Sequence, residues 1–242
     1  MSTFKEIDTE IRSHADPEKV LVLKRFFKTG PGGYGEGDSF LGIKVPTQRE
    51  IAKKFRDLNL TDLQKLITSK FHEARLISVF ILVSQYKKAK GEEKKKLVDF
   101  YLKNKDYMNN WDLVDSSAHL ITGDYLLKGF PGYDTKILFT LTKSDSVWDR
   151  RIAVLSSLAF IRKGQFEITL KLVQLLMNDK HDLMHKAVGW MLKEIGKRDE
   201  SVLEGFLDEY AAVMPRTMLR YCIEKLPEKR RKYYLSAKSR NS

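Results

Sequence analysis

The sequence predicts an all-α protein, built as an α-solenoid of HEAT-like repeats. Apolar residues recur at helical spacing through most of the 242 residues, and no clear period-two alternation persists between turn signals. A step of 38 residues separates Arg75 from Leu113 and Leu113 from Arg151, and residues 185–190 follow about one step later. Two-helix repeats of this length are typical of HEAT arrays, whose equivalent helices line one concave face.

The N-terminal third begins with two helices and a glycine-rich loop. We expect helices at 4–14 and from Pro17 to about residue 28, with Asp16 as the N-cap and Pro17 at the first helical position. Residues 29–38 then hold five glycines, which predict a helix stop and a flexible loop.

Helical periodicity resumes after Pro46 and continues almost to the end of the chain. A short helix is expected to open at 61–64, and a long amphipathic one spans 71–88. The remaining helices are expected at 92–103, 110–127, 133–143, 147–162, 166–177, 182–197, 202–212 and 216–226. We therefore predict one solenoid domain over 1–242, with extra N-terminal helices at about 1–28, a loop at 29–39 and a frayed tail at 237–242.

Composition favours a polyanionic partner and a reducing compartment. Lys and Arg number 44 against 32 Asp and Glu, which gives a net charge of +12 and a pI near 9.5. No apolar stretch approaches the roughly 20 residues of a membrane span, and the N-terminus lacks the apolar core of a signal peptide. The single cysteine, Cys222, excludes an intramolecular disulfide, is most simply a core residue, and suits the cytoplasm.

Residues 109–116 carry a tryptophan four residues before an aspartate. On a helix, Trp111 and Asp115 would project from the same face, as an aromatic wall beside a carboxylate. A carboxylate in an apolar pattern is costly unless it is paired or used. An Asp–Arg staple between repeats remains the structural alternative to a functional site.

Further aromatic and basic side chains lie on equivalent helices of the repeat. Trp148 and Arg151 are three residues apart, hence on one face, and Trp190 follows in the next repeat. Tryptophans are often core anchors, and Arg151 is equally suited to a structural ion pair. The functional interpretation is a basic concave groove, in which arginine holds phosphates, aromatic rings stack on bases or sugars, and one carboxylate stabilises positive charge on a sugar.

Four stretches in order resemble the AlkD-like DNA alkylation repair family, which are bacterial DNA glycosylases of HEAT-like repeats. These stretches are residues 40–46, 111–115, 148–153 and 186–190. The resemblance implies a monomeric enzyme of the bacterial cytoplasm, close to the nucleoid. It would excise N3- and N7-alkylated purines from double-stranded DNA and need no obligate protein partner.

By this resemblance Asp115 is the catalytic carboxylate, and Trp111 and Trp190 contact the deoxyribose of the lesion. Arg151 contacts the DNA backbone, and the DNA-binding set that we expect is completed by Trp148, Arg150, Lys186, Phe26 and Lys44. Phe26 departs from the family's pattern, because AlkD has a DNA-contacting tyrosine in the second helix. That difference bears on lesion range and efficiency more than on the reaction class.

We expect no cofactor and no metal. Residues 30–35 fit G-x-G-x-x-G, but a helix precedes them where a nucleotide-binding motif needs a strand. His181 and His185 are four apart, yet no cysteine or suitably placed glutamate accompanies them.

Two further function classes remain open on the sequence. A non-catalytic DNA-binding solenoid for damaged or branched duplexes would use the same basic groove, although it has no need of a carboxylate there. A protein-binding HEAT scaffold is the third class, and the charge of +12 places it last.

Overall fold

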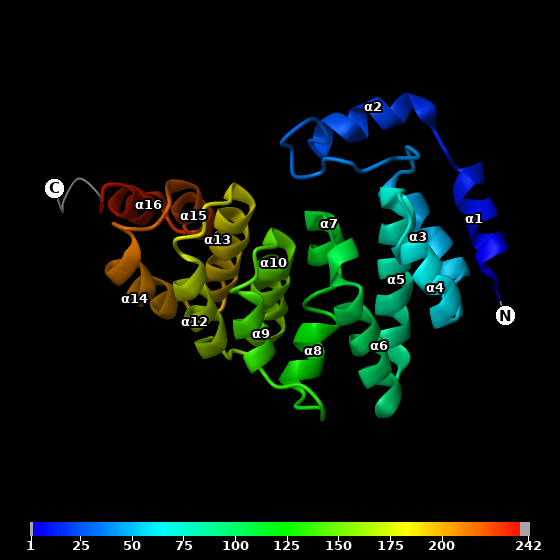
Figure 1. Cartoon of the computed structure of the whole chain (residues 1–242). Coiled ribbons are helices and arrows are strands. Elements are labelled where there is room, and N and C mark those ends of the chain that lie inside the picture. The colour runs from blue at the N-terminus through cyan, green and yellow to red at the C-terminus, as the bar shows by residue number, and fades with distance from the viewer. Residues whose placement is uncertain (1, 238–242) are drawn as a thin grey trace. The chain divides into compact units, whose positions relative to one another are not determined.

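The computed structural model describes residues 2–237, and within them every regular element is a helix (Figure 1). One isolated parallel bridge joins Ser39 to Phe71. The predicted all-α class is confirmed, and the architecture is consistent with a HEAT-like helical repeat fold. In this part of the chain, no helix has both the length and the apolar character needed to span a membrane. Most of the tail that we expected to fray, 238–242, lies outside the described residues.

Chain contacts divide the protein into two compact units, Met1–Ser117 and Ala118–Ser242. In the first unit α3, α4, α5 and α6 run roughly side by side, and α2 lies across one end of α5 (Figure 1). The helices of this unit are α1 (Phe4–Ser13), α2 (Pro17–Phe26), α3 (Val45–Lys54), α4 (Leu60–Ile67), α5 (His72–Lys88), α6 (Glu92–Lys103), the 3-10 turn η1 (Lys105–Tyr107) and α7 (Trp111–Asp115).

The second unit packs around α13, which contacts α10, α12, α14 and α15. Gly189 of α13 allows its close approach to α15, since a Cβ there would lie 2.6 Å from the Met218 carbonyl oxygen. The helices are α8 (Thr122–Leu127), α9 (Lys136–Leu141), α10 (Val147–Ser156), α11 (Leu158–Ile161), α12 (Glu167–Leu176), α13 (Asp182–Gly196), α14 (Glu200–Tyr210), α15 (Arg216–Cys222) and α16 (Glu228–Leu235).

Two of the long helices that we predicted are broken. The expected helix at 110–127 is the five-residue α7, a series of turns, and then α8. Ser117 donates from Oγ to the Leu113 carbonyl oxygen in those turns, a side-chain bond that competes with helix continuation. The helix at 147–162 is likewise interrupted at Ser157, whose hydroxyl bonds to Val154 O.

Other helix ends differ in smaller ways. Asp16 is the N-cap residue of α2, but its side chain makes no capping bond and instead pairs with Lys19. The basic residues 229–232 lie on α16, beyond the last predicted helix at 216–226.

The core of the first unit is α5, which is buried on almost every side from His72 to Val83. A helix that is apolar all round must be surrounded by other elements, and α3, α4, α6 and α7 all contact it. Its first turn is different, because it carries three buried charged residues, His72, Glu73 and Arg75. Buried charges require partners, and these partners come from the loop before α3 and from α7.

Glu73 fixes the stretch that follows the glycine-rich loop. Its carboxylate is fully buried and accepts the backbone N–H groups of Leu41, Gly42 and Ile43 at 2.8–3.3 Å. Gly42 has a φ of +85°, and a Cβ there would lie 2.0 Å from the Asp16 carbonyl oxygen. Residues 40–43 are therefore held against the start of α5 by one carboxylate and one glycine.

We predict that Glu73→Gln lowers the free energy of unfolding by roughly 2–3 kcal/mol, because an amide NH₂ would face backbone donors in a buried site. Urea unfolding followed by circular dichroism measures this change. Glu50→Gln on the exposed face of α3 is the control and should unfold like the wild type. Equal stability of the two variants would contradict the role given to Glu73.

Candidate functional site in the first unit

The helix α7 presents Trp111 at its first position and Asp115 at its last. Asn110 begins the helix: its side-chain oxygen accepts the Trp111 backbone N–H at 2.8 Å, and its own side chain is fully buried. Leu113 and Val114 face the core and are buried, whereas Trp111 and Asp115 are half-buried. The predicted shared face of Trp111 and Asp115 thus survives in a helix of only one turn and a half.

Trp111 belongs to a cluster of aromatic rings from four segments of the chain. The ring of Phe26 meets it edge-on at 5.9 Å between centroids, and the ring of Phe27 lies 5.7 Å away. Behind them Phe40 stacks on Phe27 at 5.3 Å, and the imidazole of His72 lies 4.7 Å from Phe27. Phe26 is 58% exposed, while Phe27 and Phe40 are buried. The cluster therefore has a packed base and a solvent-facing edge made of Phe26 and Trp111.

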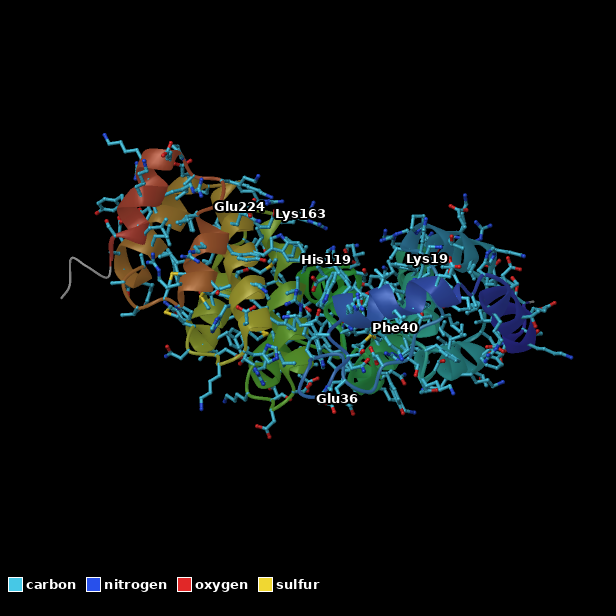
Figure 2. All side chains as sticks on the ribbon, turned by 90° about the horizontal axis from the view of Figure 1, so that it is seen from above. Lys19, Glu36, Phe40, His119, Lys163 and Glu224 are labelled. Carbon is cyan, nitrogen blue, oxygen red and sulfur yellow. The ribbon has the colours of Figure 1, made fainter. Side chains whose placement is uncertain are left out.

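The glycine-rich loop is joined to this cluster through Tyr34. The Tyr34 hydroxyl accepts the indole N–H of Trp111 at 3.2 Å and lies 3.2 Å from the Phe26 carbonyl oxygen, to which it donates. Viewed from above α2, Phe40 lies beside that helix and Glu36 lies on the outer part of the loop (Figure 2). We had expected a flexible tip, but the loop is bound to the aromatic cluster.

A buried charge cluster lies beneath the rings and joins the end of the loop to α7. His72 stands between two carboxylates, with Nε2 2.8 Å from Asp112 Oδ2 and Nδ1 3.3 Å from Asp38 Oδ2. Arg75 donates to Asp38 at 2.6 Å, and the Asn109 amide donates to the same oxygen at 3.0 Å. Two acidic and two basic groups thus neutralise one another in a site that is buried except for part of Asp112.

This pairing sets the protonation of His72. Burial lowers the pKa of the imidazole, but the hydrogen bonds to Asp112 and Asp38 outweigh burial and raise the pKa to about 9. For Asp38 the effect of burial is opposite, because burial raises the pKa of a carboxyl group. The bond from His72, the charge of Arg75 and the bond from Asn109 outweigh burial and bring the pKa of Asp38 below its usual value. At neutral pH His72 is therefore a cation that holds both carboxylates.

Asp115 lies at the border between solvent and the core. The Tyr101 phenol, fully buried in α6, bonds to Ser117 Oγ at 2.9 Å just beyond α7. Burial raises the pKa of Tyr101, and the negative charge of Asp115 adds to that rise, whereas the Ser117 bond opposes it. The charge of Asp115 therefore acts on a buried phenol of the core, although Asp115 itself is only half-buried.

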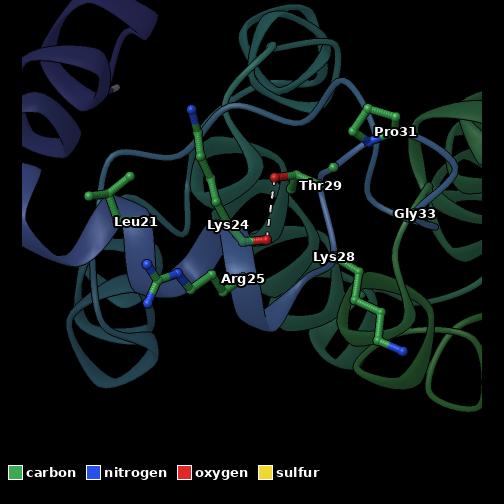
Figure 3. Close-up of a pocket in the computed structure, with 8 residues that line it drawn as sticks. Leu21, Lys24, Arg25, Lys28, Thr29, Pro31 and Gly33 are labelled. Atoms are coloured by element: carbon green, nitrogen blue, oxygen red, sulfur yellow. Dashed lines mark hydrogen bonds between the residues drawn. The ribbon is translucent and has the colours of Figure 1, made fainter.

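A basic surface pocket of about 440 Å³ lies on α2 and the start of the glycine-rich loop. It is lined by Leu21, three basic residues and the loop backbone (Figure 3): the basic residues are Lys24, Arg25 and Lys28. None of the residues of α2 is buried, and Leu21, Val22 and Phe26 are exposed apolar side chains. Such a surface is typical of nucleic-acid binding, in which cations contact phosphates and apolar groups contact sugars or bases.

Other residues predicted for DNA binding lie in the second unit. Arg151 is buried in α10 and donates from Nη1 to the Leu183 carbonyl oxygen at 2.7 Å, while Trp148 is half-buried one turn earlier. Arg150 bonds to Asp179 at 2.6 Å and to the carbonyl oxygens of Ser144 and Asp145. Both arginines thus hold neighbouring segments of this unit.

The α13 residues are more accessible. Lys186 pairs with Asp182 one turn earlier at 2.6 Å and keeps 36% of its side chain exposed. Trp190 is half-buried, and its indole N–H lies 3.2 Å from Glu194 Oε1. In the first unit, Lys44 is exposed at the N-cap of α3.

The two histidines at 181 and 185 serve local structure. His181 Nδ1 accepts the Leu183 backbone N–H at the start of α13, and His185 Nε2 lies 2.5 Å from the Asp179 carbonyl oxygen. Among the residues that the structure describes, no group of three His, Cys, Asp or Glu side chains is placed to bind a metal ion.

Comparison with known proteins identifies the family. Residues 7–226 match the family described as DNA alkylation repair enzyme. The chain belongs to this family. A solved structure with the same fold is a predicted DNA alkylation repair enzyme from Enterococcus faecalis, with a TM-score of 0.67, 17% identity, and coverage of 89% of this chain and 98% of that one. Among curated proteins, none matches this sequence.

Membership of the family supports an enzyme that acts in repair of alkylation damage, and it makes DNA the expected partner. The resemblance noted in the sequence is thereby confirmed. The sequence indicated Trp111, Asp115 and Phe26, but not the charged residues that hold α7 and the loop against α5, which are Asp38, His72 and Asp112. The available signal was a His-Glu pair in the first turn of a long apolar helix, where charges are out of place.

We predict that the free energy of unfolding falls as pH rises from about 6 to about 10, with a His72 contribution of roughly 3 kcal/mol. The pKa of His72 is higher in the folded protein than in the unfolded chain. Its stabilisation is therefore complete below pH 6.5 and is lost as pH rises through about 9.

Urea unfolding at both pH values, for the wild type and His72→Gln, measures this contribution as the difference in their pH dependence. His14→Gln, at an exposed histidine, is the matched control and should keep the wild-type dependence. A His72→Gln variant with the same pH dependence as the wild type would contradict the charged state assigned to His72.

Proposed function

We propose that the protein is a DNA glycosylase that hydrolyses the N-glycosidic bond of N3- and N7-alkylated purines in duplex DNA. The observation that carries this proposal is the pairing of Trp111 and Asp115 on α7, beside the exposed ring of Phe26. Membership of the DNA alkylation repair enzyme family supports the same reaction class.

The chemistry suits a single carboxylate. An alkylated purine already carries positive charge, so it leaves without strong acid assistance, and the sugar develops oxocarbenium-like charge as the bond breaks. A half-buried carboxylate such as Asp115 can stabilise that charge or orient the attacking water, because its field is less screened than in bulk solvent. The rings of Trp111 and Phe26 would attract a cationic lesion through cation–π interactions with their faces.

Basic residues of each unit would bind the DNA backbone. In the first unit we propose that Lys24, Arg25 and Lys28, which line a pocket on α2 and the start of the glycine-rich loop, bind phosphates. In the second unit we propose that Lys186 and Trp148 contact the DNA backbone and that Trp190 contacts the deoxyribose of the lesion. Arg150 and Arg151 bond to neighbouring segments of their own unit, so we propose that they shape the DNA-binding surface rather than contact phosphate directly.

We predict that the purified protein releases N7-methylguanine from methylated duplex DNA, and that Asp115→Asn slows this release by roughly 100-fold or more, since the amide lacks the stabilising charge. The measurement is single-turnover release of labelled base, compared with spontaneous depurination. DNA affinity should change little, because the carboxylate acts on the transition state.

Asp106→Asn is the matched control, because it removes an exposed carboxylate from the segment just before α7. It should release base at the wild-type rate. Release no faster than the spontaneous rate in the wild type, with DNA binding retained, would select a non-catalytic DNA-binding protein instead.

We predict that Lys186→Gln reduces the slope of log affinity against log salt by about one, because one phosphate contact is lost. Fluorescence anisotropy with duplex DNA at several salt concentrations measures that slope. Lys171→Gln on α12 is the control, since that lysine also pairs with an acidic residue one turn away. If both variants have the same slope as the wild type, Lys186 does not contact phosphate.

A further inference from the structure

The glycine-rich loop at 29–38 is anchored at two points to the segment around α7. Near its middle, Tyr34 accepts a hydrogen bond from Trp111, and at its end Asp38 accepts one from Asn109. Within the loop, Gly33 N–H bonds to the Gly30 carbonyl oxygen at 2.9 Å. The Tyr34–Trp111 and Asp38–Asn109 bonds join two segments that are more than seventy residues apart in the sequence.

The loop can approach α2 because two glycines lack a side chain. A Cβ on Gly33 would lie 1.8 Å from the Lys28 carbonyl oxygen, and one on Gly35 would lie 2.3 Å from the Phe27 carbonyl oxygen. Gly30, in contrast, has no atom within 4 Å of the position of a Cβ. The path of the loop, and with it the position of Tyr34, therefore depends on Gly33 and Gly35.

The Tyr34 hydroxyl uses both of its hydrogen-bonding functions at this point. It donates to the Phe26 carbonyl oxygen and accepts the Trp111 indole N–H. An indole has only one donor, so a tryptophan held in this way is fixed in rotation about its side-chain bonds. The same hydroxyl thus ties together the two residues that form the exposed aromatic edge, Phe26 and Trp111.

We infer that Tyr34 is a positioning residue that sets the Trp111 ring for the damaged nucleotide, so that the glycine-rich loop is part of the repair site. This inference rests on the proposed function and deepens it. Trp111 contacts the nucleotide through its ring, because its only N–H is already bound to the loop. Small displacements of a positioning group are expensive in rate, since the reacting geometry has a narrow tolerance.

A purely structural role for Tyr34, in ending α2, makes a different prediction. The Phe26 carbonyl lies at an exposed helix end, where water can replace the tyrosine hydroxyl. Losing the hydroxyl would then leave both Trp111 and the reaction unchanged. The positioning role requires instead that Trp111 respond to the loss of the hydroxyl, with the fold intact.

Tyr34→Phe tests the role, because it keeps the ring and removes only the hydroxyl. We expect an unchanged melting temperature, an unchanged affinity for methylated duplex, and a single-turnover rate of base release lowered roughly three- to tenfold. In ¹H–¹⁵N spectra the Trp111 indole signal, identified by its loss in Trp111→Phe, should shift, and its proton should exchange at least about threefold faster. An unmoved indole signal would overturn the inference.

Gly33→Ala and Gly30→Ala provide an independent pair of variants. Gly33→Ala must displace the loop, so it should move the Trp111 signal and slow base release, while Gly30→Ala should match the wild type. If the two variants behave alike, the loop does not position Trp111. If the wild type releases no base, the proposed glycosylase function fails, and the indole signal alone decides whether Tyr34 positions Trp111.

Discussion

The first unit depends on the contact between His72 and the two carboxylates of Asp38 and Asp112. Asp38 ends the glycine-rich loop, His72 begins α5, and Asp112 lies in the first turn of α7. A buried carboxylate without a partner would destabilise the fold strongly, so the three segments must meet for any of them to be stable there. The aromatic cluster of Phe27, Phe40 and Trp111 is built on this base, and the accessible part of the candidate site is its upper edge.

The buried charge cluster is connected directly to the residues proposed for the reaction. His72 holds Asp112, Asp112 belongs to α7, and α7 carries the aromatic ring and the carboxylate that the proposed reaction needs. The glycine-rich loop also holds α7, because the Tyr34 hydroxyl accepts a hydrogen bond from the Trp111 indole. Lys24 and Arg25 belong to α2, the helix that ends at Phe26, and in the proposed function they would bind phosphates.

Sequence periodicity was enough for the all-helical class and for most helices, because amphipathic spacing reflects which face is buried. It failed at residues 110–127 and at Ser157, where the helices are interrupted and serine hydroxyls bond to carbonyl oxygens of the preceding turn. The Trp111–Asp115 pair was recognisable from spacing and resemblance. The contacts of Tyr34 and Asp38 were not, since they join positions that are distant in sequence and leave no local pattern.

The shortness of α7 has a consequence for how relatives of this protein are interpreted. A helix of five residues has almost no stability of its own, because the cost of nucleation is spread over too few hydrogen bonds. The orientation of its tryptophan and aspartate is therefore inherited from the loop and from α5. A homologue could retain both residues at the same spacing and still lose the geometry through a change at the equivalent of Tyr34, Asp38 or His72. Retention of the pair is thus a weaker guide to activity than retention of its supports.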